Sequence, residues 1–151
     1  MKRVTTLFIS LTLAFSASGA DAPASGVKGG LVVHLGCGDG TRTVALRKND
    51  AHVVFGLDRN RENVTAARKY IQEKGVYGTV TADLLAGTRL PLIDNIVNLL
   101  VAEGETGIEE AEIMRVLTPG GVALVNGKTI TSPVPADSDE WTHFLHGPDN
   151  N

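Results

Sequence analysis

The sequence predicts a doubly wound α/β fold built on about five parallel strands. Short apolar runs alternate with stretches of helical periodicity, a pattern typical of a parallel sheet covered on both faces. The first run starts at Leu31 and breaks into glycines at Gly36, and the second ends in Asp58, 22 residues after that glycine. A strand, a glycine turn, a helix and an acid ending the next strand describe a nucleoside-binding βαβ unit. The ligand should therefore carry a ribose.

Each predicted element has its own signal. In the second helix, Val64, Ala67 and Ile71 share one side, which gives that helix an apolar stripe for the sheet. Pro119–Gly121 ends the third helix and starts the last strand, and the segment Leu84–Asp94 reads as irregular. The expected strands are Leu31–Leu35, His52–Leu57, Gly78–Thr81, Ile96–Val101 and Val122–Val125, and the expected helices are Thr41–Lys48, Arg61–Lys74 and Ile108–Leu117.

Composition limits the classes of partner. The chain has 151 residues, 42% of them hydrophobic, and a formal charge of −3, which suits one globular domain that buries roughly 68–70% of its unfolded surface. Lys and Arg form no cluster along the chain, so nothing in the sequence predicts nucleic-acid binding. A small-molecule partner is favoured.

The first 20 residues have the features of a secretory signal peptide. Lys2 and Arg3 precede the apolar run Val4–Ala17, and Ser18–Ala20 offers the small residues that a signal peptidase reads. Cleavage after Ala20 would leave 12 basic and 17 acidic residues, no stable membrane span, and a chain exported to the periplasm or the exterior. The alternatives are an uncleaved anchor and a misassigned start codon. Asp21–Gly30 then reads as a linker before a domain over residues 31–126.

The spacing of the glycines narrows the choice of ligand. Gly36, Gly38 and Gly40 run G-x-G-x-G, whereas dinucleotide-binding folds use G-x-G-x-x-G, and position 41 is Thr. G-x-G-x-G is the spacing of S-adenosylmethionine enzymes, and it makes an NAD-dependent oxidoreductase a distant alternative. Glycine suits this turn because the backbone takes angles that a side chain opposes and because the ligand lies almost on the main chain.

With these residues in view, the chain resembles the class I S-adenosylmethionine-dependent methyltransferases over about residues 31–126. The resemblance implies a Rossmann-like sheet, S-adenosylmethionine as the cofactor and a methyl acceptor as the substrate. The segments that carry it are V-V-H-L-G-C-G-D-G from Val32 to Gly40, Gly56-Leu57-Asp58, Thr81-Ala82-Asp83-Leu84, and M-R-V-L-T-P-G-G from Met114 to Gly121.

The resemblance also implies roles for single residues. The three glycines, with Cys37 between the first two, would let the backbone approach the methionine and ribose portions. Asp58 would accept two hydrogen bonds from the ribose diol, Asp83 one from the adenine amino group, and the main chain of Leu84 would reach the ring. Arg59 would flank the adenine. The alternatives are a helix-capping acid at position 58, a plain turn residue at position 83, and a small buried residue at Cys37.

Two features depart from the family pattern. The family commonly has an acid two positions before the first glycine, where this chain has His34. A neutral imidazole there brings no negative charge to the methionine ammonium, at a cost of roughly 1–3 kcal/mol. The alternative is a buried His34 satisfied by local partners. The family's terminal antiparallel hairpin is expected to be missing, because Gly127–Ser138 carries Pro133 and Pro135 and reads as a linker.

The last residues, Asp139–Asn151, resemble the lead-in to a quinoprotein-like β-propeller, which predicts a further C-terminal domain absent from this chain. His143 and His146 stand three apart, but no reliable third and fourth ligands accompany them, so no metal site is predicted.

Two functions remain open. One is methyl transfer to a small acceptor, with Glu103 at the carboxyl end of the fourth strand as the candidate base or substrate contact. The other is a degenerate, non-catalytic module of methyltransferase fold within an exported multi-domain protein.

Overall fold

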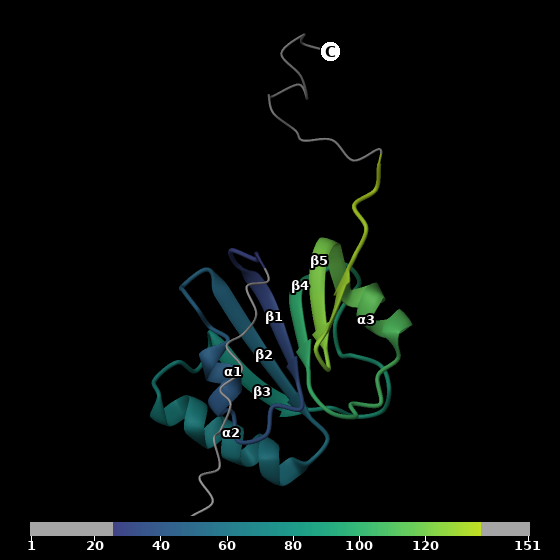
Figure 1. Ribbon diagram of the computed structural model, residues 1–151. Helices are drawn as coiled ribbons and strands as arrows, with labels where there is room; N and C mark the ends of the chain where they lie inside the picture. Colours follow the sequence, from purple (N-terminus) through teal and green to yellow (C-terminus); the bar gives the residue numbers. More distant parts are fainter. Residues whose placement is uncertain (1–25, 137–151) are drawn as a thin grey trace, which may run out of the picture.

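The computed structural model describes residues 26–136, which form a six-stranded sheet with helices on both faces (Figure 1). The strand order is β3-β2-β1-β4-β5-β6, with β1 to β5 parallel and β6 antiparallel to β5. The predicted fold class is confirmed. The strands are β1 (Gly30–Leu35), β2 (His52–Asp58), β3 (Val80–Leu84), β4 (Val97–Ala102), β5 (Leu117–Val125) and β6 (Lys128–Thr131), and the helices are α1 (Thr41–Ala45), α2 (Arg61–Glu73) and α3 (Glu110–Val116).

Helices α1 and α2 cover one face of the sheet. The apolar stripe predicted for α2 is buried, and its Ala67 and Ile71 belong to the same core cluster as Val54 of β2 and Val80 of β3. Helix α2 begins where the Asn60 side chain accepts hydrogen bonds from the main chain of residues 62 and 63, at 2.7 and 3.4 Å. This cap fixes the start of α2 directly after the end of β2.

The other face is covered by α3 and by the segment between β3 and β4. This segment is irregular, as predicted for Leu84–Asp94. Arg115 of α3 donates to the carbonyls of Leu90 and Leu92 at 3.4 and 3.0 Å and pairs with Glu112 at 2.7 Å. The Arg115 guanidinium lowers the pKa of Glu112 to about 2. This ion pair and its carbonyl contacts hold a segment without regular structure against the core, to which Leu85 and Leu90 belong.

Several boundaries differ from the predicted ones. Helix α1 ends at Ala45, and Asn49 then forms a turn into β2, in which its side chain accepts from the main chain of Ala51 at 2.9 Å. Strand β3 runs on to Leu84, and β5 starts at Leu117, which pairs with Val97 of β4.

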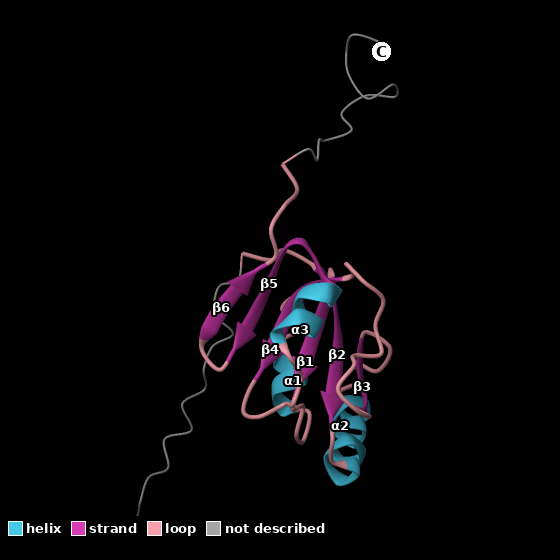
Figure 2. Ribbon diagram, turned by 90° about the vertical axis from the view of Figure 1, so that its right-hand side faces the viewer, coloured by secondary structure: helices cyan, strands magenta, loops and turns pink. Residues whose placement is uncertain are grey.

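The prediction that the terminal antiparallel hairpin is missing is wrong. Strand β6 pairs with β5 through a two-residue turn, with Val125 opposite Lys128 (Figure 2). The turn residues Asn126 and Gly127 have φ of 49° and 82°, the left-handed angles of a type I′ turn. Asn-Gly is the strongest short-range sequence signal for a hairpin. The prediction gave more weight to the prolines that follow and therefore read this segment as a linker.

Some predictions lie outside the described residues. They are the signal peptide over residues 1–20, the linker residues up to 25, and the tail from residue 137, with His143 and His146. Within residues 26–136, no helix is long and apolar enough to cross a membrane, and no three His, Cys, Asp or Glu side chains form a group that could hold a metal ion.

Gly40 and Gly38 should differ in their effect on stability. A Cβ at Gly40 would lie 2.8 Å from the Ala67 Cα atom, whereas a Cβ at Gly38 meets no atom within 4 Å. Both residues have positive φ. We expect Gly40→Ala to lower the free energy of unfolding by about 2–5 kcal/mol and Gly38→Ala by about 1–2 kcal/mol. Urea unfolding measures both, and equal losses would contradict the close packing of the loop on α2.

Candidate functional site

The glycine loop leaves β1 and folds back onto the end of β2. The main-chain N–H groups of Gly36 and Cys37 both donate to the carbonyl of Leu57, at 2.8 and 3.2 Å. Gly36 and Gly38 have φ of 80° and 53°, angles that an L side chain opposes. The loop therefore presents bare main chain at the carboxyl end of the sheet.

Asp58 fastens this loop to the start of α2. Its carboxylate accepts from the main chain of Gly38 at 2.9 Å, from the main chain of Asn60 at 2.8 Å and from the Asn63 amide at 3.2 Å. A carboxylate has about four acceptor sites, so three donors leave about one free. Asp58 is 8% exposed. Its donors therefore lie in the glycine loop and at the start of α2, and they leave about one acceptor site rather than the two that a ribose diol would use.

A cleft of about 90 Å³ opens beside Asp58 at the carboxyl ends of β1, β2 and β4. Its position is the point of the sheet where the strand order reverses, which is where ligands bind to folds of this class. The cleft brings together four of the predicted site residues, Gly36, Asp58, Arg59 and Glu103. The lining residues are Gly36, Leu57, Asp58, Arg59, Leu85, Glu103, Glu105 and Thr106.

Arg59 crosses this cleft. Its Nε donates to the carbonyl of Thr106 at 2.9 Å, and its guanidinium lies 3.0 Å from where a Cβ on Gly107 would be. Pockets for small molecules usually have volumes of about 300–1,000 Å³. A nucleoside-sized ligand therefore has to displace Arg59 from Thr106.

The loop after β4 is held by the β5–β6 turn. The Asn126 amide donates to the carbonyl of Gly104 at 3.3 Å and accepts from the Gly104 N–H at 2.7 Å. The Asn126 N–H also donates to Ala102 at 3.0 Å. Glu103 and Glu105 flank Gly104, so Asn126 positions the mouth of the cleft. Sequence reasoning missed Asn126, and the Asn-Gly turn signal could have identified it.

Glu103 is ion-paired with Arg42 of α1. The two side chains are 50% and 30% exposed. This pair joins the loop after β4 to the helix that follows the glycine loop.

His34 lies beneath α1, outside the cleft lining. It is 2% exposed, its Nδ1 lies 2.9 Å from the Thr43 hydroxyl, and its Nε2 has no partner in the described residues. Burial, with a smaller contribution from the Arg42 charge, lowers the pKa of His34 to about 4. The imidazole is therefore neutral at pH 7. Burial also raises the pKa of Cys37 to about 11, so its thiol stays protonated.

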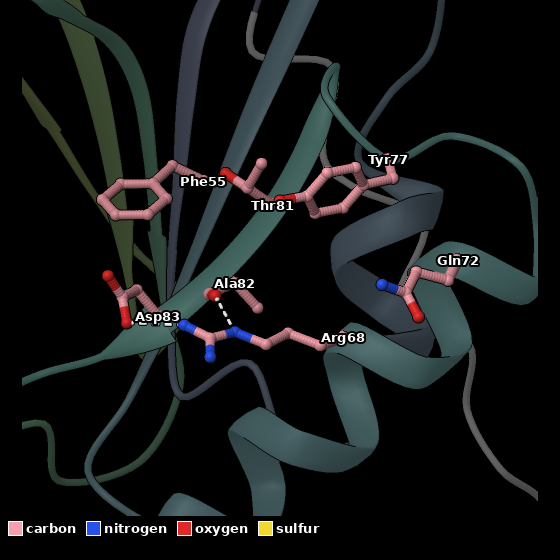
Figure 3. A pocket seen from close by; sticks show the side chains of 7 residues that line it. All are labelled: Phe55, Arg68, Gln72, Tyr77, Thr81, Ala82 and Asp83. Carbon is pink, nitrogen blue, oxygen red and sulfur yellow. Dashed lines mark hydrogen bonds and ion pairs between the residues drawn. The ribbon is translucent and has the colours of Figure 1, made fainter.

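Asp83 lines a second cavity at the edge of the sheet and does not line the cleft. Arg68 of α2 donates to Asp83 at 2.8 Å and to the carbonyl of Ala82 at 2.9 Å (Figure 3). Asp83 also accepts from the Leu84 N–H at 2.8 Å. This cavity has a volume of about 450 Å³, and it is lined by Phe55, Arg68, Gln72, Tyr77, Thr81, Ala82 and Asp83.

The comparisons with known proteins decide the family. A family model described as a methyltransferase domain matches residues 32–121. The match runs from β1 through the glycine loop, Asp58 and the loop after β4 into β5. The chain belongs to this methyltransferase-domain family. No curated protein matches the chain. Family membership supports S-adenosylmethionine as the cofactor, as the sequence predicts.

Solved structures agree on the methyltransferase fold. A Methanococcus maripaludis protein, provisionally described as an S-adenosylmethionine-dependent methyltransferase, is 24% identical with a TM-score of 0.61, over 68% of this chain and 49% of that one. The [4+2]-cyclase SpnF is 26% identical with a TM-score of 0.58, over 64% and 38%. A geranyl diphosphate methyltransferase in complex with SAM is 20% identical with a TM-score of 0.58, over 64% and 41%. The chain spans about half or less of these relatives.

The residues at the cleft fit the cofactor of a methyltransferase. Bare main chain at Gly36 allows close approach, and Asp58 keeps one acceptor site for a hydroxyl. Glu103 and Glu105 add carboxylates that suit the positive sulfonium. The cleft volume of about 90 Å³ is smaller than such a ligand needs, and Arg59 is one of the residues that line it.

Asn126→Gly should loosen the mouth of the cleft, because glycine keeps the turn angles and removes both amide contacts with Gly104. We expect the protection of the Gly104 amide against hydrogen exchange to fall by about tenfold. NMR-detected exchange measures this, and the amides of β1 serve as the internal control. Unchanged protection of Gly104 would contradict the proposed hold on the loop.

His34 should make folding sensitive to acid. Its pKa is lowered from 6.5 to about 4 in the folded chain, so the unfolded chain binds the proton more readily. The free energy of unfolding is therefore highest above pH 6.5 and falls as the pH is lowered from 6.5 to 4. The total loss from this one group is on the order of 3 kcal/mol. His34→Asn should flatten this part of the stability profile. An NMR titration midpoint near 6.5 for His34 would refute the account.

Proposed function

We propose that this chain binds S-adenosylmethionine at the cleft and transfers its methyl group to a small acceptor. The observation that carries the proposal concerns the Asp58 carboxylate. It binds the main chain of the glycine loop at the point where the strand order of the sheet reverses, and it retains an acceptor site. A family match over the same residues supports it.

Within this proposal, Asp58 accepts one hydrogen bond from the ribose, and Gly36 and Gly38 accept the close approach of the ligand to the main chain. Arg59 leaves Thr106 when the ligand enters and then flanks the adenine. Asp83 and Leu84 remain assigned to the adenine. Because Asp83 is held by Arg68 in the edge cavity, this assignment requires the adenine to reach the edge of the sheet.

The cofactor supplies a methyl group made electrophilic by the sulfonium. The protein has to align the acceptor and, for an oxygen or nitrogen nucleophile, to receive a proton. Glu103 is the predicted base, but its carboxylate is paired with Arg42. Glu105 lines the same cleft and has no ion pair in the described part of the chain. We therefore assign proton acceptance to Glu105 and a binding role to Glu103.

The structure also offers an argument for the second candidate, a non-catalytic module. Arg59 narrows the cleft to about 90 Å³, and His34 is neutral. A similar fold is found in the [4+2]-cyclase SpnF, so the fold alone does not define the reaction. A module of this kind, exported as part of a larger protein, would bind little or no cofactor.

Titration calorimetry of the full chain with S-adenosylmethionine separates the two candidates. We expect micromolar binding of S-adenosylmethionine. The three hydrogen bonds that Asp58 accepts already fix the glycine loop, so the ligand does not have to order it. Asp58→Asn should weaken binding by at least about tenfold, because it removes a charged acceptor. Gly38→Ala should do the same, because its methyl group fills the approach.

Asp50→Asn is the matched control, because Asp50 is exposed in the turn between α1 and β2, pairs with Arg47 and does not line the cleft. Thermal unfolding without ligand shows that each variant is folded. A folded wild-type chain that binds no cofactor would overturn the proposal in favour of the non-catalytic module.

A further inference from the structure

The Arg42–Glu103 ion pair joins the helix that follows the glycine loop to the loop after β4. Arg42 is the second residue of α1, two residues after Gly40, and Glu103 follows β4. The main-chain oxygen of Glu103 lies 3.4 Å from where a Cβ on Gly36 would be. One negative and one positive side chain thus stand together beside the bare main chain of the loop.

The other acidic candidates beside the loop are placed less well than Glu103. Asp39, inside the loop, accepts from the Thr41 N–H at 2.9 Å and does not line the cleft, and Glu105 lines the cleft two residues further along the chain. His34 occupies the position of the usual acid, yet it is buried and neutral and its Nδ1 is engaged with Thr43. Asp58 is committed to three donors, one in the glycine loop and two at the start of α2. Among the described residues, Glu103 is the carboxylate that both lines the cleft and lies against Gly36.

The ion pair can open at low cost. Both partners are partly exposed, and pairs of this kind contribute little to stability because water screens them and their long side chains lose freedom. A ligand that carries both a carboxylate and an ammonium can replace each partner with one of its own charges. A guanidinium binds a carboxylate through two parallel hydrogen bonds, which makes Arg42 well suited to the exchange.

We propose that Arg42 and Glu103 clamp the zwitterionic amino-acid end of the cofactor, with Arg42 holding the carboxylate and Glu103 the ammonium. The inference rests on the proposed function, and it assigns to position 103 the charge that His34 does not supply. It also gives the ion pair a purpose beyond joining the loop after β4 to α1.

Two ligands test the clamp by binding alone. S-adenosylhomocysteine carries the zwitterion, and 5′-methylthioadenosine has the same adenosine and a thioether without it. We expect calorimetry on the full chain to give tighter binding of S-adenosylhomocysteine. Arg42→Gln and Glu103→Gln should each weaken that binding by about 10- to 100-fold and leave the affinity for 5′-methylthioadenosine within about twofold.

The controls are Lys69→Gln and Glu73→Gln, which make the same charge changes in an exposed ion pair on α2. Unchanged binding of S-adenosylhomocysteine in both cleft variants would overturn the clamp, as would equal weakening of both ligands. In either case, intact binding of 5′-methylthioadenosine to the wild type leaves the proposed function standing. A folded wild type that binds neither ligand would overturn both.

Discussion

The candidate site depends on the buried carboxylate of Asp58. A charge that is 8% exposed is costly unless donors surround it, and here Gly38, Asn60 and Asn63 provide three. The same bonds tie the glycine loop to the start of α2, and Gly40 packs against Ala67 on that helix. The need of one buried carboxylate for hydrogen-bond donors therefore determines both the shape of the loop and the acceptor site beside it.

The opposite wall of the cleft depends on contacts between residues distant in sequence. Asn126, in the turn between β5 and β6, holds Gly104, and Arg42 of α1 holds Glu103. The hairpin that ends the described sheet therefore also supports the mouth of the cleft. Arg59 joins the two walls through Thr106, so opening the cleft for a cofactor requires one exposed hydrogen bond to break, at a cost of about 0.5–1.5 kcal/mol.

The sequence predicted the parallel sheet because its signals are local: apolar runs, the apolar stripe of α2 and the glycines at 36, 38 and 40. Of the predicted site residues, Gly36, Asp58, Arg59 and Glu103 line the cleft, whereas His34 and Asp83 do not. Contacts such as Arg59 with Thr106 and Arg42 with Glu103 join positions far apart in the chain, and no local pattern encodes them. Strand β6 was missed for a different reason, because the Asn126-Gly127 turn signal was outweighed by the prolines that follow it.

The central claim is that the cleft beside Asp58 binds the cofactor. The most direct test is an NMR titration of the full, labelled chain with S-adenosylhomocysteine, following the amide signals of the glycine loop. Binding at the cleft predicts shifts at Gly36, Gly38 and Thr106, with the signals of β6 unchanged. Shifts confined to the edge cavity around Tyr77 and Thr81, or no shifts from a folded chain, would contradict the account.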